Sequence, residues 1–194
     1  YMALTCYLNG SLAREAVRNE YGLDWDGFTA ALQATPPGND GGLMLPYFAP
    51  EIVPNVPEAH VVRHHLDAAN AQANVRAIIE AQALSSAIHA RWMGVDITSI
   101  YVTGGASANA EILRVYANVH NCPIHRFETT NSAALGAALR AAHGHNPADS
   151  WQETVGPFTQ PSPGSTIEPD GEAVAAYRNL VGTYETLEQT HTNN

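Results

Sequence analysis

The chain has 194 residues, of which 45% are hydrophobic and 14% charged, so it can form a globular domain with a sizeable core and is too apolar for overall disorder. Nine basic residues, all arginine, stand against 19 acidic ones, and the formal net charge of −10 disfavours a nucleic-acid backbone or an anionic membrane surface as partner. No run approaches the roughly 20 apolar residues that span a bilayer and no secretory signal opens the chain, so we expect a cytoplasmic protein.

The first residues form an apolar stretch. Residues 2–8 run into Asn9-Gly10, a pattern typical of a buried strand that ends in a turn. The chain opens on Tyr1 without a leader, so we expect a piece of a longer protein. Cys6 and Cys122 lie far apart without a CxxC spacing, which predicts two reduced, buried thiols and no zinc ribbon.

The next segment alternates helices with turn residues. A helix capped by Ser11 should end near residues 21–22, and Asp24 should cap a second helix that stops at the prolines of 36–38. Residues 43–47 predict a short strand, which Pro46 places at a sheet edge or a strand end. The proline- and histidine-containing stretch 49–66 predicts an irregular loop.

The second half predicts a longer pattern of helices and strands. Residues 70–93 form the longest helical pattern, with Gly94 as its stop. A strand at 97–102, a helix at 107–120, a strand at 124–127 and a helix at 131–142 follow, and a final helix covers about 169–189. This order predicts an α/β domain whose mixed sheet is flanked by helices.

The most informative motif is the turn Thr103-Gly-Gly-Ala106 between a strand and a helix. Glycines let a ligand approach bare backbone, and the N-terminus of a helix favours anions, so this geometry suits a nucleotide. The alternative is a tight turn in which Ser107 only caps the helix. The spacing is neither a Walker A loop nor a GxGxxG fingerprint.

Several motifs together resemble the carboxy-terminal domain of the FGGY family of carbohydrate kinases. They are Thr103-Gly-Gly-Ala-Ser-Ala-Asn109, Cys122-Pro123 and Asn131-Ser-Ala-Ala-Leu-Gly-Ala-Ala138. Residues 1–15 and 18–20 resemble the eukaryotic xylulokinase branch of that family, and the resemblance spans nearly the whole of 1–194. It implies an actin-like, ribonuclease H-like ATPase fold.

The resemblance also implies a function and a site. The reaction would be phosphorylation of D-xylulose to D-xylulose 5-phosphate by ATP with Mg²⁺, and this domain would hold the adenosine. The implied nucleotide-facing residues lie in two turns: Gly104, Gly105, Ala106 and Asn109, and Asn9, Gly10 and Ser11. The sugar contacts and the catalytic aspartate belong to an amino-terminal domain whose motifs this chain lacks, so we assign no catalytic residue and expect no activity from the chain alone.

Other readings stay open at this point. A related sugar or polyol kinase, or a non-catalytic nucleotide-binding or interaction domain, fits the same residues, and the chain could self-associate. Glu51 is a weak site candidate because the surrounding run departs from that of bacterial relatives. We assign no metal to His60, His64, His65 and Asp67, which lie in the expected loop, and we interpret Asp24 and Asp26 as cap and surface acids.

Overall fold

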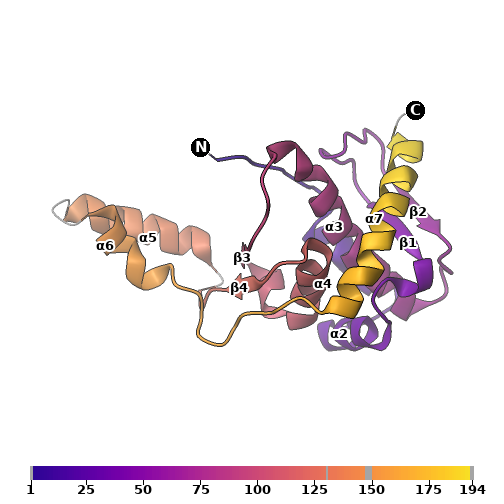
Figure 1. Cartoon of the computed structure of the whole chain (residues 1–194), viewed down its shortest axis with the longest axis horizontal. Coiled ribbons are helices and arrows are strands. Elements are labelled where there is room, and N and C mark those ends of the chain that lie inside the picture. The colour runs from indigo at the N-terminus through magenta and orange to yellow at the C-terminus, as the bar shows by residue number, and fades with distance from the viewer. Residues whose placement is uncertain (1, 130, 147–149, 193–194) are drawn as a thin grey trace.

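The computed structural model describes residues 2–129, 131–146 and 150–192, and Tyr1 lies outside these ranges. Figure 1 shows a body of helices and short strands from which one helical pair extends. The helices are α1 (Ser11–Glu20), α2 (Trp25–Ala34), α3 (Ala71–His89), α4 (Ala110–His120), α5 (Ser132–His145), α6 (Trp151–Val155) and α7 (Gly171–Thr192). The strands are β1 (Leu43–Tyr47), β2 (His60–His64), β3 (Ile100–Val102) and β4 (Ile124–Arg126). The short 3₁₀ turns within these ranges are η1 (Asn39–Gly41), η2 (Arg91–Met93), η3 (Gly105–Ala108) and η4 (Gly156–Phe158).

The strands of the described part of the chain form two separate sheets instead of one mixed sheet. β1 and β2 pair antiparallel, with Leu43 opposite His64 and Tyr47 opposite His60. β3 and β4 pair in parallel, and a bridge between Ile124 and Ile167 adds to this second sheet. The α/β class expected from the sequence is therefore present, with the sheet divided into two small units.

Helix α3 is the centre of the body. It contacts α1, α2, α4, α7 and β1, and its residues are buried on more than one face. A helix in this position needs apolar side chains around most of its circumference, and Val75, Ile78, Ile79 and Leu84 are fully buried. The expected central packing helix is confirmed, although it ends at His89 and a 3₁₀ turn leads to Gly94.

Helix α7 closes the other side of the core. Tyr177 and Tyr184 on this helix are each 1% exposed and belong to two adjoining hydrophobic clusters. Asp170 begins the helix, since its Oδ1 accepts the Ala173 N–H at 2.9 Å, so Pro169 lies before the helix and not in its first turn.

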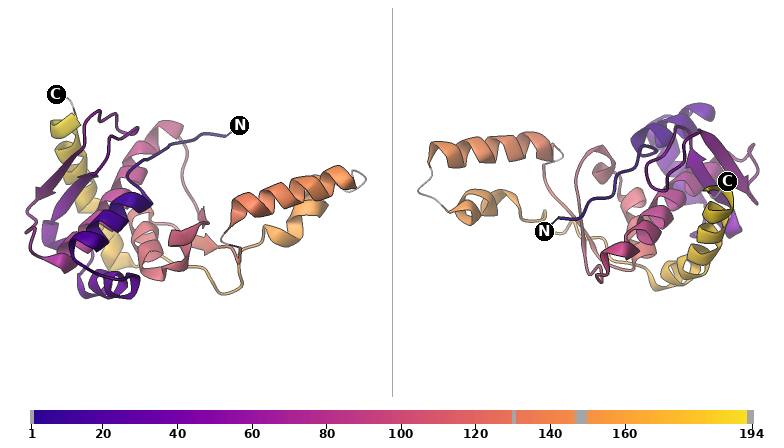
Figure 2. Two further views of the ribbon diagram at one scale, coloured as in Figure 1. Left: turned by 180° about the vertical axis from the view of Figure 1, so that it is seen from behind. Right: turned by 90° about the horizontal axis from the view of Figure 1, so that it is seen from above.

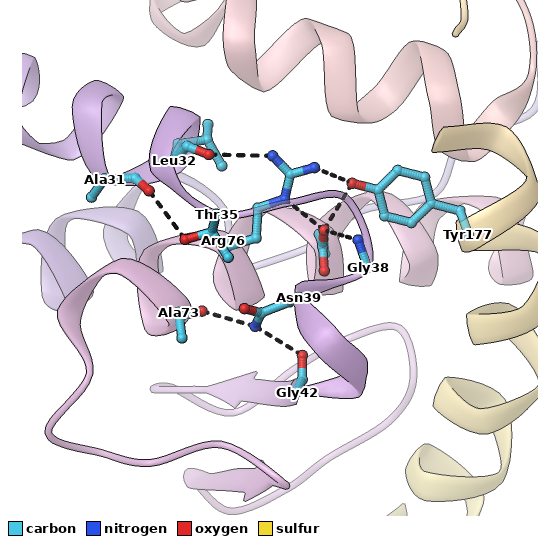
Figure 3. A network of polar contacts seen from close by, with 10 residues as sticks. Ala31, Leu32, Thr35, Gly38, Asn39, Gly42, Ala73, Arg76 and Tyr177 are labelled. Carbon is cyan, nitrogen blue, oxygen red and sulfur yellow. Dashed lines mark hydrogen bonds and ion pairs between the residues drawn. The ribbon is translucent and has the colours of Figure 1, made fainter. Parts of the chain in front are cut away.

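A buried polar network joins α3, α7 and the loop before β1 (Figure 3). The carboxylate of Glu80 accepts bonds from the Arg76 Nε at 2.6 Å, the Tyr177 hydroxyl at 2.8 Å and the Gly38 N–H at 2.9 Å. Arg76 also donates to the Tyr177 hydroxyl at 2.6 Å. The network fixes the loop that ends α2 to the two long helices.

Three sequence-based expectations about the first 66 residues are wrong. Residues 2–8 form no strand, because no described strand lies beside them, and Met2 and Leu4 are 87% and 70% exposed. Cys6 in this segment is exposed, whereas Cys122 is buried as expected. The stretch 49–66 is not wholly irregular, because His60–His64 pairs with β1.

Helices α5 and α6 contact each other and project away from the body (Figures 1 and 2). The imidazole of His143 and the ring of Trp151 meet edge to face, with centroids 5.2 Å apart. Where the chain leaves and rejoins the body, the Ser162 N–H donates to the Arg126 carbonyl at 2.8 Å. Across the described residues, no helix combines the length and apolarity that a membrane crossing needs.

Candidate functional site

An open pocket of about 590 Å³ lies between α1, α2, η3 and the start of α4. A volume of this size is typical of sites for small molecules and cofactors. Its polar lining comes mainly from α1 and α2 and includes Ser11, Arg14, Glu15, Asp26, Thr29 and Gln33. The opposite wall is backbone-rich and contains Gly105, Ala106, Ala108 and Asn109.

The two glycines of the turn after β3 serve different purposes. Gly104 has φ 91° and ψ 179°, a conformation that side chains make costly, so glycine is needed there for the backbone. Gly105 lies outside the positive-φ region, and a Cβ placed on it would meet no protein atom within 4 Å. Because Gly105 lines the pocket, the missing side chain leaves room for a ligand.

Asn109 and not Ser107 caps the helix that follows. The Asn109 Oδ1 accepts the N–H groups of Glu111 and Ile112 at 3.0 and 3.2 Å, and α4 begins at the next residue. The Ser107 hydroxyl instead donates to the Gly104 carbonyl at 2.6 Å and tightens the turn. Sequence reasoning placed the cap wrongly because a 3₁₀ turn precedes the helix.

Asn109 also joins the two walls of the pocket. Its Nδ2 donates to the Thr29 hydroxyl of α2 at 2.8 Å, and that hydroxyl donates to the Trp25 carbonyl at 2.8 Å. An amide Nδ2 carries two hydrogens, and the bond to Thr29 uses one of them. Asn109 therefore holds the floor of the pocket and retains capacity for one more donated bond.

The residues of the turn before α1 line two different cavities. Ser11 lines the main pocket, whereas Asn9 and Gly10 line a neighbouring cavity of about 120 Å³, and Arg14 borders both. The N-cap position of α1 is Gly10, which offers no side chain, so Ser11 is the first residue of the helix and not its cap. Four of the seven expected residues, Ser11, Gly105, Ala106 and Asn109, thus lie around one pocket, and Gly104 lines neither cavity.

Glu51 accepts hydrogen bonds from the turn before α1 and does not line the main pocket. It is 6% exposed, and its carboxylate accepts bonds from the N–H groups of Leu8, Asn9 and Ile52 at 2.7, 2.9 and 2.8 Å. Burial acts to raise the pKa of this carboxyl, but these hydrogen bonds outweigh burial and hold the pKa below its ordinary value. Glu51 is therefore charged near neutral pH.

The sequence did not predict that α2 forms a wall of the pocket. Trp25, Thr29 and Gln33 recur every four residues, a spacing that puts them on one helix face, and all three line the pocket. The guanidinium of Arg18 lies 4.5 Å from the centre of the Trp25 ring and holds it in place. Asp24 caps α2 as expected, by accepting the Gly27 N–H at 2.7 Å, whereas Asp26 lines the pocket.

The histidines of the expected loop do not gather into a metal site. His64 and His65 have adjacent rings, with centroids 4.0 Å apart, while His60 faces Tyr47. Over the part of the chain that the structure describes, no group of three or more His, Cys, Asp or Glu side chains could hold a metal ion.

Comparisons with known proteins agree with the resemblance seen in the sequence. Residues 1–145 match the model of the FGGY family of carbohydrate kinases, C-terminal domain. The xylulose kinase of Mus musculus is 38% identical over 202 residues, covering 97% of this chain and 36% of that protein. Xylulose kinase 2 of Arabidopsis thaliana is 35% identical over 162 residues, covering 74% of this chain and 29% of that protein.

Solved structures share the fold. The ligand-bound xylulose kinase from Lactobacillus acidophilus superposes with a TM-score of 0.82 at 21% identity, over 95% of this chain and 38% of that one. The expected fold class, an α/β domain of the actin-like, ribonuclease H-like ATPase type, is thereby confirmed. The chain spans 36% of the length of the Mus musculus relative.

Proposed function

We propose, from the premise that this chain belongs to the FGGY family of carbohydrate kinases, that it is the adenosine-binding half of an ATP-dependent xylulose kinase. The whole enzyme would transfer the terminal phosphoryl group of ATP to a hydroxyl of D-xylulose, giving ADP and D-xylulose 5-phosphate. The observation that supports this role is the pocket itself, in which bare backbone at Gly105 faces polar groups on α1 and α2.

The lining suits a nucleoside in several ways. The ring of Trp25 offers an apolar face for a base, and Thr29 and Gln33 offer hydrogen-bonding groups along the same wall. Ser11 and Arg14 bring the start of α1 and a cation to the lining of the pocket, and both favour phosphate charge. We therefore propose that the base lies toward α2 and the phosphates toward α1.

The remaining parts of the reaction are proposed to come from outside this chain. Phosphoryl transfer needs Mg²⁺ to neutralise the phosphates and a group that orients the attacking hydroxyl. We propose that Mg²⁺ would enter with ATP, and we assign the catalytic aspartate and the sugar contacts to an amino-terminal domain of the whole protein. Closure of the two domains would exclude water from the transferring phosphoryl group.

We also propose that residues 1–194 act as one domain and that the enzyme is cytoplasmic. The family match ends at residue 145, but α7 lies beyond it and packs on α3 and α4, with Tyr177 and Tyr184 in the core. The exposed side chains of Met2, Leu4 and Leu8 favour association with the amino-terminal domain or with a second copy of this chain.

The proposed pocket can be tested by titrating the chain with MgADP in a calorimeter. Gly105→Val should weaken ADP binding more than tenfold, because a branched side chain fills space that the structure leaves open for a ligand. Gly136→Val is the matched control, since Gly136 also has no neighbour within 4 Å and lies on α5, away from the pocket.

A second variant separates binding from stability. Ser107→Ala removes the bond to the Gly104 carbonyl, so it should lower the unfolding free energy by about 1 kcal/mol and affect ADP less than Gly105→Val does. Equal ADP affinity in Gly105→Val and the parent would place the nucleotide elsewhere.

A further inference from the structure

The turn at residues 8–10 has backbone groups that no helix or strand satisfies. Residues 2–7 form no ladder, and α1 begins only at Ser11. Buried backbone N–H and C=O groups need partners, so side chains from elsewhere must supply them. The turn leads directly into the helix start that borders the main pocket.

Glu51 satisfies the backbone donors of Leu8 and Asn9 in this turn. Its Oε1 accepts the Leu8 N–H at 2.7 Å, and its Oε2 accepts the Asn9 N–H at 2.9 Å and the Asn9 Nδ2 at 3.0 Å. Asn9 adds two bonds to residue 49, because its Oδ1 accepts the Ala49 N–H and its Nδ2 donates to the Ala49 carbonyl, each at 2.9 Å.

Gln82 of α3 bonds two of the backbone acceptors of this turn. Its Nε2 donates to the carbonyls of Asn9 and Gly10, each at 2.8 Å. The Arg14 guanidinium donates to the Gln82 Oε1 at 2.7 Å. Arginine can only donate, so this contact fixes the orientation of the amide and turns its N–H groups toward the two carbonyls.

The bonds that hold the turn at residues 8–10 also position the start of α1. Gly10 precedes α1 without a side-chain cap, and the one local bond to its carbonyl, from the Arg14 N–H, is long at 3.4 Å. The carbonyl of Gly10 is held by Gln82, which belongs to the rigid, buried helix α3. The position of Ser11 and Arg14 in the pocket therefore depends on a side chain 72 residues away from Gly10.

We propose that Gln82 is a positioning residue for the nucleotide site: it fixes the turn at residues 8–10, so that the start of α1 faces the phosphates, without touching the nucleotide itself. The inference rests on the proposed function of the pocket. Gln82 lines only the smaller cavity, on the other side of Arg14, which separates its role from direct binding.

The test uses the 194-residue chain and the variant Gln82→Glu. This change keeps the size of the side chain and an acceptor for Arg14, but it replaces the amide donor with an oxygen that repels the two carbonyls. Gln72→Glu is the matched control, since Gln72 lies exposed on the same helix. Hydrogen–deuterium exchange at residues 8–14 and calorimetric titration with MgADP are measured on each protein.

We expect Gln82→Glu to speed exchange of the Leu8 and Asn9 amides at least tenfold and to raise the dissociation constant for MgADP at least tenfold. Exchange in the core of α3 should stay within twofold of the parent, which a general loss of stability would not allow. Gln72→Glu should leave both measurements unchanged. Gln82→Ala, which removes the donor without adding a charge, should give the same two changes.

The outcomes separate this inference from the proposed function. Unchanged exchange at residues 8–14 in Gln82→Glu overturns the positioning role, and so does faster exchange with the MgADP affinity of the parent. A parent chain that binds no MgADP contradicts the proposed pocket, while the exchange data still decide whether Gln82 holds the turn.

Discussion

Two buried glutamates, Glu51 beside the site and Glu80 in the core, have pKa values shifted in opposite directions. Glu51 has a pKa below its ordinary value, because hydrogen bonds outweigh the burial that would raise it. Burial raises the pKa of Glu80 in spite of the adjacent Arg76 and Tyr177. The two side chains are the same, so the arrangement of hydrogen-bond donors and the depth of burial must decide the direction of the pKa shift.

The distribution of donors differs between the two carboxylates. Each oxygen of Glu51 accepts two bonds: Oε1 from Leu8 and Ile52, and Oε2 from two nitrogens of Asn9. All three bonds to Glu80 reach Oε1, and its fully buried Oε2 has no hydrogen-bond partner in the described structure. A carboxylate is stabilised as an anion when both of its oxygens accept hydrogen bonds. Donors that reach only one oxygen do not offset the cost of burying the charge completely.

The largest expected loss of stability comes from a substitution that breaks the buried polar network of Arg76, Glu80 and Tyr177. Arg76→Met removes the cation from Glu80 and should lower the unfolding free energy by about 3–5 kcal/mol, because one partner of a buried ion pair is left behind. Urea denaturation at pH 7 followed by circular dichroism measures the change. Arg140→Met, at an exposed position of α5, should change stability by less than about 0.5 kcal/mol. A loss below about 1 kcal/mol in Arg76→Met would contradict the proposed importance of the pair.

A smaller loss is expected at the site. Glu51→Gln should lower the unfolding free energy at pH 7 by about 1.5–3 kcal/mol, because it weakens bonds to a charged acceptor and turns an amide toward N–H donors. Glu58→Gln, in the same loop and exposed, is the control for loss of a negative charge. If the two variants were equally stable, the bonds to Glu51 would contribute nothing.

The pH dependence of the two glutamine variants sharpens the comparison. A lowered pKa means that Glu51 stabilises the fold above the ordinary carboxyl value of about 4.3, and that this contribution is lost as the pH falls through its folded-state pKa. The raised pKa of Glu80 means that its ionisation weakens the fold as the pH rises above about 4.3. From pH 3 to pH 7 the cost of Glu51→Gln should therefore grow and the cost of Glu80→Gln should shrink. Urea titrations across this range give both slopes, and slopes of the same sign would refute the contrast.

The smallest expected loss of stability comes from breaking an ion pair on the surface, and it serves as the reference for the buried pair. Arg91 and Glu185 form an ion pair at 2.9 Å, with side chains 53% and 34% exposed. Arg91→Ala should lower the unfolding free energy by less than about 1 kcal/mol, and 1 M salt should remove most of the difference. A loss comparable to that of Arg76→Met would mean that burial does not distinguish the two pairs.

Part of the fold could be predicted from local signals in the sequence. The cap at Asp24, the stop at residues 36–38 and the strand at 43–47 depend on neighbouring residues, and all three are present. The alternation of strands and helices from 97 to 142 was predicted for the same reason, with boundaries that shift by a few residues. The resemblance to the family rested on motifs in these segments, and it is confirmed.

The site was predictable only in part. The glycine turn and Ser11 stood out in the sequence, and the structure places Gly105, Ala106 and Ser11 around one pocket, although their contact with a nucleotide stays a prediction. Trp25 and Thr29 carried no motif beyond a spacing of four. Their importance became visible only when α2 was seen opposite Asn109.

The sequence by itself determined which residues could end helices, bend the chain and form apolar faces, because these properties depend on neighbours within a few positions. Only the tertiary structure decided what residues far apart in the chain do together. Residues 2–8 look like a strand but have no described partner strand, and His60–His64 looks irregular but pairs with β1. Glu51 and Gln82 meet the turn at residues 8–10 from 42 and 73 positions away in the sequence, and no local pattern encodes such a meeting. Hydrogen-bond partners and burial depend on which segments the core brings together, so they become defined only when the chain has folded.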